Sequence, residues 1–425
     1  MRRKLVTDQT RCADANGLSS KNARFEFSVK SIFFESTTMM VRSPFCSLIR
    51  SLTRSRMRWS LAPMAAFWLA GAAWAHAPSE PPHQAFALGD LKLESGESIR
   101  DFSISYVTHG TLNANKSNAV LMVTSIGGNH HRIDYLIGPG KALDPAKYFI
   151  ICTDAIGNGL STSPSNSAVQ PRMQFPKFNI RDMVNSQQRL ATEKFGIQKL
   201  VTVVGASMGG MQALQWAVSY PERVDSVVPI IPLGRTPAWT TGVLEMLRQT
   251  IMADPRWMGG NYAASAPPEQ GMRLWAGWLS GVITRTPGFQ ESQLPNASDA
   301  VAYLRGVEDN GWKRMDANDW IYQSWAYDQH NLGTTPGFNG DYPRALKSIK
   351  AKTLVLAGTG DLLNPEYEAM DAARYIADVR YVPINERRAM GHVSGAGISA
   401  PENELQNREA GNFLDVVTER GRKIQ

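Results

Sequence analysis

Short apolar segments recur along the chain, and each has the length of a buried strand. They cover residues 119–123, 148–152, 200–204, 227–231, 353–356 and 379–382, whereas residues 102–108 alternate between apolar and polar. Segments with helical spacing lie among them, at residues 181–195, 211–217 and 367–376. Strands that alternate with helices predict an α/β fold, with a mostly parallel sheet and helices on both of its faces.

Residues 234–341 interrupt this alternation. The segment is rich in Trp and Met, has no strand-like run, and contains helical patterns at residues 243–251, 271–283 and 312–329. We interpret it as a helical cap inserted into a core formed by residues 76–233 and 342–425. A second independent domain is the alternative, but the position of the segment between two predicted strands favours a cap.

A serine flanked by glycines lies where the strand at residues 200–204 gives way to the helix at residues 211–217. Gly205, Ser207 and Gly209 form a Gly-x-Ser-x-Gly pattern. A strand, tight turn and helix in this order predict the nucleophile elbow of an α/β-hydrolase fold. The simpler interpretation is an ordinary serine in a glycine-rich turn, and the flanking pattern favours the nucleophile.

A nucleophilic serine needs a base, and the base needs an orienting carboxylate. In this fold the chain order is Ser, then Asp or Glu, then His. Asp361 follows the strand at residues 353–356, and His392 follows the last predicted strand. We therefore predict Ser207, Asp361 and His392 as a catalytic triad. Asp371 and Asp378 are weaker candidates for the acid, because they lie in or after the next helix.

An oxyanion hole would complete such a site. We expect the backbone N–H groups of Met208 and of Ile126, in the loop after residues 119–123, to form it. His130 and His131 lie in the same loop, where they line the pocket or occupy the surface. The sequence offers no metal-ligand spacing, so we predict no metal and no resident cofactor.

The basic charge of the chain is concentrated near its N-terminus. The formal net charge is +7, but residues 1–75 hold 12 of the 45 basic and 4 of the 38 acidic residues, which leaves 33 basic against 34 acidic. This distribution, without a nucleic-acid motif, excludes a nucleic-acid partner. Cys152 is the one cysteine outside this segment, and we expect it to pack within a strand.

Residues 1–75 have the features of a leader with a secretory signal peptide. Arg54, Arg56 and Arg58 precede an apolar stretch at residues 61–74, and residues 73–75, Ala-Trp-Ala, fit the small-x-small rule for a cleavage site. We therefore predict a translation start near Met57 and a periplasmic or secreted protein with no membrane contact after cleavage. A buried or membrane-anchoring helix is the alternative.

Beyond the elbow, the chain resembles the homoserine O-acetyltransferase family of α/β-hydrolases. The similarity extends over most of the chain from about residue 102, and it is carried by residues 136–144, 148–152, 157–165, 207–213, 248–255 and 316–318. The resemblance implies the same triad and acyl transfer through an acyl-serine by a ping-pong route. A homodimer is one assembly hypothesis. We predict substrate contacts from Arg248 and Trp275, although core packing explains Trp275 equally well.

Two features of this chain differ from the pattern of the homoserine O-acetyltransferase family. The family pattern implies an arginine that holds the homoserine carboxylate five residues after a glycine that opens a cap helix. Here that glycine is Gly271 and the matching residue is Ala276, so a contact worth roughly 1.5–3 kcal/mol is lost. In addition, an exported protein would lack cytosolic acetyl-CoA.

We therefore expect an exported esterase that uses a small ester and water. A homoserine O-acetyltransferase with acetyl-CoA as cosubstrate is the alternative, and a binding protein without activity is the third.

Overall fold

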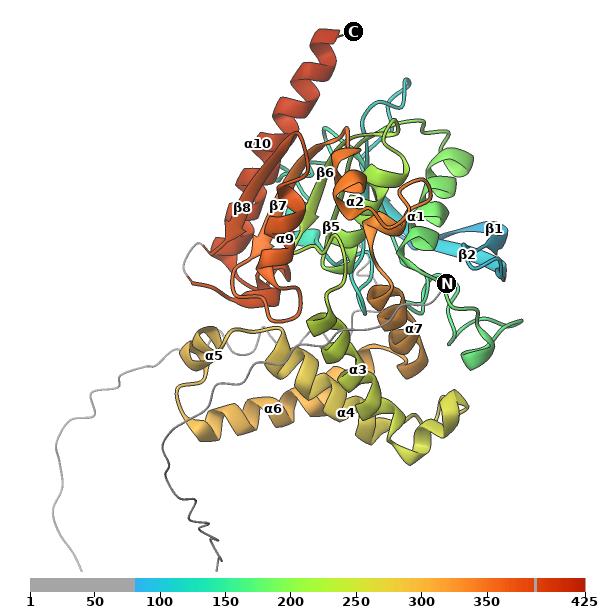
Figure 1. Ribbon diagram of the computed structural model, residues 1–425, viewed down its shortest axis with the longest axis vertical. Helices are drawn as coiled ribbons and strands as arrows, with labels where there is room; N and C mark the ends of the chain where they lie inside the picture. Colours follow the sequence, from blue (N-terminus) through green and yellow to red (C-terminus); the bar gives the residue numbers. More distant parts are fainter. Residues whose placement is uncertain (1–80, 386–387, 425) are drawn as a thin grey trace, which may run out of the picture. The chain divides into compact units, whose positions relative to one another are not determined.

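The computed structural model describes residues 81–385 and 388–424, and the predicted leader lies outside them. Eight strands form one sheet in the order β1-β2-β4-β3-β5-β6-β7-β8 (Figure 1). β2 is antiparallel to both of its neighbours, β1 and β4. All the remaining neighbouring pairs, from β4–β3 to β7–β8, are parallel. The bounds are β1 Gln84–Lys92, β2 Ser98–His109, β3 Ala119–Val123, β4 Phe149–Thr153, β5 Leu200–Ala206, β6 Val224–Ile230, β7 Lys352–Gly358 and β8 Val379–Ile384.

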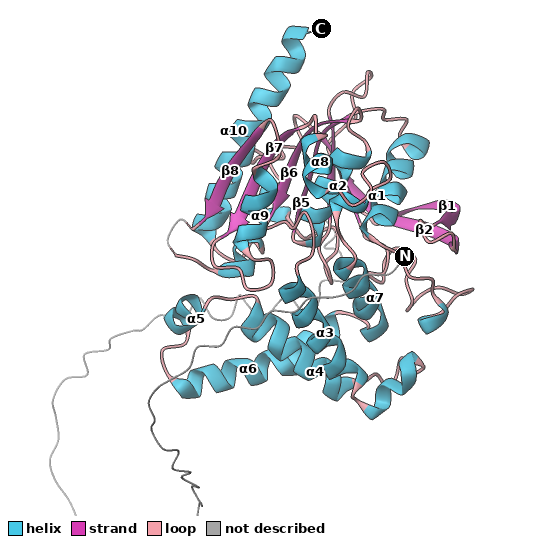
Figure 2. Cartoon of the chain, viewed as in Figure 1, coloured by secondary structure: helices cyan, strands magenta, loops and turns pink. Residues whose placement is uncertain are grey.

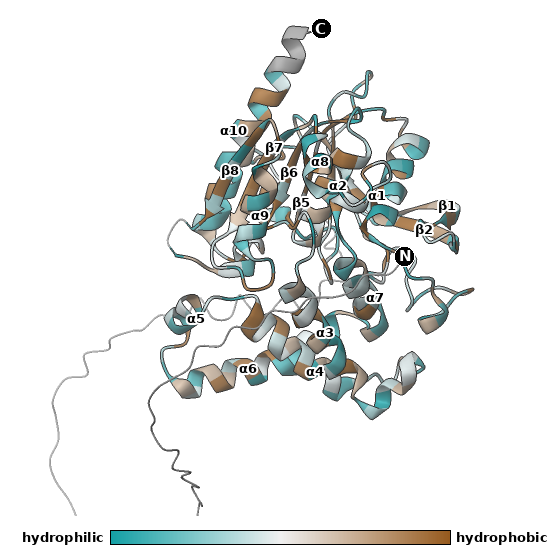
Figure 3. Ribbon diagram, viewed as in Figure 1, coloured by the Kyte–Doolittle hydropathy of each residue, from teal (hydrophilic) through white to brown (hydrophobic). Residues whose placement is uncertain are grey.

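Helices cover both faces of the sheet, as the alternation predicted. On one face lie α1 (Ile180–Arg189), α2 (Met208–Ser219), α8 (Tyr342–Lys347) and α9 (Glu366–Ala373), and on the other lies α10 (Ala400–Ile424) (Figure 2). Alternate residues of β3 enter two separate apolar clusters: Leu121 packs with α1 and α2, and Met122 packs with α10. Burial on both faces explains why the inner strands are continuous apolar runs, which are coloured as hydrophobic in Figure 3.

The segment between β6 and β7 is helical throughout its regular structure. It contains α3 (Ala238–Met252), α4 (Glu269–Trp278), α5 (Pro287–Gln293), α6 (Ala297–Gly311) and α7 (Ala317–Asp328). It touches the loops at the carboxyl ends of the strands: Thr240 Oγ1 donates to the carbonyl of Leu363 at 2.7 Å, and Gly127 lies against Trp320. The helices therefore lie over the edge of the sheet where α/β proteins bind ligands.

Two local features differ from the sequence expectations. Strand β1 was not predicted, because a register shift around Gly89 interrupts its alternation and only one of its faces is buried. The helix expected at residues 181–195 changes at Leu190 into a π-helical turn, Leu190–Lys194, and Gly196 ends it with φ +65°. No helix among the described residues is long and apolar enough to cross a bilayer.

Candidate active site

Ser207 occupies the sharp turn between β5 and α2. Its backbone has φ 59° and ψ −120°, a strained conformation for a residue with a side chain. A Cβ atom at Gly205 or at Gly209 would lie 2.5 Å from the carbonyl oxygen of Val123 in the neighbouring strand. Glycine is therefore required on both sides of the serine for β5, α2 and β3 to approach this closely.

The three predicted triad residues meet at this turn. His392 Nε2 lies 2.9 Å from Ser207 Oγ, and His392 Nδ1 lies 2.8 Å from Asp361 Oδ2. Their exposed fractions are 1% for Ser207, 4% for Asp361 and 7% for His392, so the contacts are shielded from water. In this arrangement His392 can accept the serine proton while the carboxylate holds the other ring nitrogen.

The Asp361 carboxylate is held in one orientation by its own loop. Oδ1 accepts hydrogen bonds from the backbone N–H groups of Leu363 and Asn364, both at 2.8 Å. These two contacts leave Oδ2 directed at His392. Asp371, an alternative acid, lies on α9 and pairs with Arg235, which precedes α3. Asp378 pairs with Lys352 at the start of β7.

The loop that contains His392 is hydrogen-bonded to the helical segment between β6 and β7, which is the predicted cap. His392 lies in a short 3-10 turn, Gly391–Gly395, in which Gly391 adopts φ +75°. The backbone N–H of Val393 donates to the carbonyl of Thr284 at 3.0 Å, and Thr286 Oγ1 donates to the carbonyl of Ala389 at 2.6 Å. The cap therefore helps to position the predicted base.

The two predicted oxyanion donors lie in loops that are tied to each other. Met208 is the first residue of α2, where the helix N-terminus favours negative charge. Ile126 lies in the turn that follows β3, and the preceding carbonyl of Thr124 accepts a hydrogen bond from Gln212 Nε2 of α2 at 2.9 Å. Gly127 N–H is already used, since it donates to Gln323 at 2.9 Å. The role of Ile126 and Met208 as donors stays a prediction.

Tyr327 is a site residue that the sequence analysis missed. Its buried hydroxyl donates to Asn364 Oδ1 at 2.5 Å and lies beside the Ser207 side chain. Burial raises the pKa of Tyr327 well above its ordinary value, so it remains a neutral hydroxyl at pH 7. A tyrosine inside a helical pattern of the cap gives no sequence signal for this position.

Arg248 was predicted to contact substrate and lies buried between α3 and α7. Its guanidinium pairs with Glu245 at 2.9 Å and Asp328 at 2.6 Å, and Nη1 donates to Ser324 Oγ at 3.0 Å. These contacts neutralise its charge and connect the two helices. A substrate role for Arg248 stays a prediction.

Trp275 is also buried, and its ring meets that of Trp320 edge-on at 5.3 Å. Within the described residues, neither indole N–H has a hydrogen-bond partner. Trp320 lies against Gly127 of the predicted oxyanion loop. An unpaired buried donor is costly, and it is Trp320 that lies nearer the predicted oxyanion loop. A substrate role for Trp275 stays a prediction.

The sheet, the elbow and the Ser-His-Asp arrangement together define an α/β-hydrolase. A family model described as "alpha/beta hydrolase fold" matches residues 118–394. The protein is therefore an enzyme, either a hydrolase or an acyltransferase.

More specific similarities identify the family. A homoserine O-acetyltransferase of Nostoc punctiforme is 36% identical over 311 residues, which cover 68% of this chain and 85% of that protein. The structure of a homoserine O-acetyltransferase from Bacillus anthracis has a TM-score of 0.70 at 27% identity, covering 78% of this chain and 97% of the other. The structure of an acetylester hydrolase from Corynebacterium glutamicum has a TM-score of 0.73 at 30% identity, covering 79% and 96%. The chain belongs to the homoserine O-acetyltransferase family.

Proposed function

We propose that the protein transfers an acetyl group, by way of an acyl-serine at Ser207, to the hydroxyl group of a small acceptor such as homoserine. The hydrogen-bonded series Ser207–His392–Asp361 is the observation that carries the proposal. The homoserine O-acetyltransferase relatives favour acetyl transfer over the exported esterase expected from the sequence. Acetyl-CoA is the donor proposed with it.

The geometry supports a two-step reaction. In the first step Ser207 Oγ attacks the acetyl carbonyl carbon, His392 Nε2 takes the hydroxyl proton, and the N–H groups of Met208 and Ile126 receive the charge that develops on the carbonyl oxygen. The tetrahedral intermediate collapses, the thiolate of the donor leaves, and His392 returns the proton to it. In the second step His392 takes the proton of the acceptor hydroxyl, whose oxygen attacks the acyl-serine carbonyl. The second tetrahedral intermediate then collapses, the bond to Ser207 Oγ breaks, and His392 returns the proton to Ser207 Oγ.

Hydrolysis of acetyl esters is the second candidate, and the surroundings of Ala276 favour it. Ala276 is fully buried in α4, and its Cβ atom lies only 3.0 Å from the position of a Cβ built on Gly311 of α6. The nearby arginines are engaged elsewhere: Arg273 pairs with Asp309, and Arg285 packs over Tyr303. The arginine that the family resemblance implies for a homoserine carboxylate therefore has no evident substitute in α4. In this case water takes the place of the acceptor hydroxyl.

Product analysis separates the two candidates. The purified enzyme is given acetyl-CoA, or a simple acetyl ester, with and without homoserine, and O-acetylhomoserine and acetate are both quantified. The transferase proposal predicts O-acetylhomoserine formed faster than acetate, and loss of both products in Ser207→Ala. Acetate released at the same rate with and without homoserine, and no acetylated acceptor, would refute the transferase proposal in favour of the esterase.

Export and assembly are proposed separately. We propose that residues 1–75 direct export, and N-terminal sequencing of the mature protein tests this, since an intact leader would contradict it. Export would separate the enzyme from acetyl-CoA and so would favour the esterase candidate. A homodimer is likewise a proposal, to be tested by light scattering in solution.

A further inference from the structure

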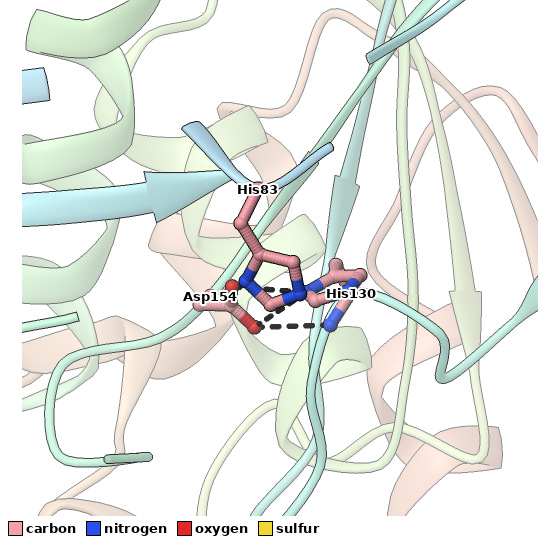
Figure 4. Close-up of side chains that lie close together, drawn as sticks. All are labelled: His83, His130 and Asp154. Carbon is pink, nitrogen blue, oxygen red and sulfur yellow. Dashed lines mark hydrogen bonds and ion pairs between the residues drawn. The ribbon is translucent and has the colours of Figure 1, made fainter. Parts of the chain in front are cut away.

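Two imidazole rings and a carboxylate from distant parts of the chain meet beside the predicted oxyanion loop (Figure 4). His83 directly precedes β1, His130 lies in the loop after β3, and Asp154 directly follows β4. One nitrogen of each ring and one carboxylate oxygen all lie within 4.8 Å of one another. His130 and Asp154 are buried, and His83 is exposed at the open side of the group.

The Asp154 carboxylate is held firmly but has little positive charge to balance it. Oδ2 accepts from Ser105 Oγ at 2.8 Å, and Oδ1 accepts from Asn158 Nδ2 and from the backbone N–H of His130, both at 3.0 Å. These donors are neutral. Its one ion-pair partner in the described part of the chain is the His130 ring, with Nδ1 3.0 Å from Oδ2. A compensating positive charge stabilises a fully buried carboxylate beyond what neutral hydrogen-bond donors provide, and a bound cation would supply that charge.

The distances suit a small tetrahedral cation. Two ligands at about 2.0–2.1 Å from a tetrahedral zinc ion are separated by about 3.3 Å. The 3.0 Å between His130 Nδ1 and Asp154 Oδ2 would need to widen by only a few tenths of an ångström. The exposed ring of His83 already meets the His130 ring edge-on, with 4.4 Å between the ring centroids.

We propose that His83, His130 and Asp154 bind one divalent transition-metal ion, with Zn²⁺ as the expected occupant and water as the fourth ligand. Imidazole nitrogen with one carboxylate oxygen suits zinc and related metals, whereas Mg²⁺ and Ca²⁺ prefer oxygen ligands alone. Ser105 and Asn158 are then the outer partners that orient the carboxylate. The proposal departs from the sequence prediction of no metal, which had no local motif to consider because the three ligands lie 47 and 24 residues apart.

The ion would have a structural task next to the reaction. Asn158 Nδ2, besides contacting Asp154, donates to the carbonyl of Gly128 at 3.2 Å, in the loop that contains Ile126. A metal ion would therefore connect the start of β1 to the predicted oxyanion loop. The predicted triad needs no metal for its chemistry. The metal-site proposal can therefore be tested independently of the acyl-transfer proposal.

Direct metal binding tests the site. The full chain, without a polyhistidine tag, is stripped of metal with a chelator, and Zn²⁺ is titrated in by calorimetry and in competition with a chromophoric chelator. Co²⁺ serves as a spectroscopic probe of tetrahedral coordination, and Mg²⁺ as the negative control. His83→Ala is the test variant because the exposed side chain can be removed without unfolding the protein. His131→Ala is the matched control, since the His131 ring packs beside His130, with 4.3 Å between ring centroids, but pairs with Asp134 at 2.7 Å and is not one of the three donors.

The proposal predicts one Zn²⁺ per chain and a tetrahedral Co²⁺ spectrum. It predicts an affinity reduced at least about tenfold in His83→Ala, and an unchanged affinity in His131→Ala. Three results would overturn it: no stoichiometric binding of Zn²⁺ by the wild type, equal affinities for wild type and His83→Ala, or a loss in His131→Ala as large as that in His83→Ala.

Discussion

Asp361→Asn is the exchange for which the structure makes the most specific prediction. An amide has one acceptor and one donor end, whereas the carboxylate accepts on both sides. The backbone N–H groups of Leu363 and Asn364 now donate to Oδ1, so the amide oxygen must take that position. At about 1 kcal/mol each, these two hydrogen bonds favour that orientation about thirtyfold.

The amide NH₂ would then face His392 Nδ1, where Oδ2 now lies at 2.8 Å. It would donate to Nδ1 and place the ring proton on Nε2, directed at Ser207 Oγ. The imidazole could then no longer accept the serine proton. The same exchange in a serine-protease triad lowers kcat by about 10⁴-fold, and we predict a loss of that order here, equivalent to about 5 kcal/mol of transition-state stabilisation.

The assay is steady-state turnover of a chromogenic acetyl ester, with thermal unfolding as a check that the variant is folded. Asp378→Asn is the matched control, because Asp378 is the exposed alternative acid that pairs with Lys352, and it should keep the wild-type rate. A folded Asp361→Asn variant with kcat within tenfold of the wild type would refute the assignment of Asp361.

Three other perturbations test separate parts of the account. Gly209→Ala would place a Cβ 2.5 Å from the carbonyl oxygen of Val123, so urea unfolding should show a loss of about 1–3 kcal/mol together with loss of activity; wild-type stability would contradict the close packing. Tyr327→Phe removes a hydroxyl that contacts Ser207 and should lower kcat about tenfold, whereas an unchanged kcat would assign Tyr327 to structure alone. Burial lowers the pKa of His330 to about 3, so its stabilising contribution is present above pH 6.5 and is lost as the pH falls toward 3. Between pH 7 and pH 5 the wild type should therefore lose about 2 kcal/mol more unfolding free energy than His330→Gln, and equal losses would disprove the linkage.

The central part of the fold could be predicted because burial on both faces leaves a simple pattern. The strand predicted at residues 119–123 is β3, Ala119–Val123, and every position in it is buried. β1 could not be predicted in the same way, because it lies at the edge of the sheet and Gly89 shifts its register. Its pairing with β2 depends on tertiary contacts that a local pattern does not contain.

In the candidate site, too, some residues could be predicted from a local sequence pattern and others depend on tertiary contacts. The elbow has a local signature, and the fold prescribes the chain order of the acid and the base, so Ser207, Asp361 and His392 could be chosen before their contacts were known. Tyr327 and the group formed by His83 and its two partners depend on which loops the topology brings together. Nothing in the sequence around those residues distinguishes them from ordinary packed or surface side chains.

Covalent trapping shows whether Ser207 is the nucleophile. The enzyme is treated with a fluorophosphonate, and the modified residue is located by peptide mass spectrometry, with Ser207→Ala as the control. We expect stoichiometric modification of Ser207, complete loss of activity in parallel, and no adduct in Ser207→Ala. Full activity after modification of Ser207, or an active Ser207→Ala enzyme, would contradict it.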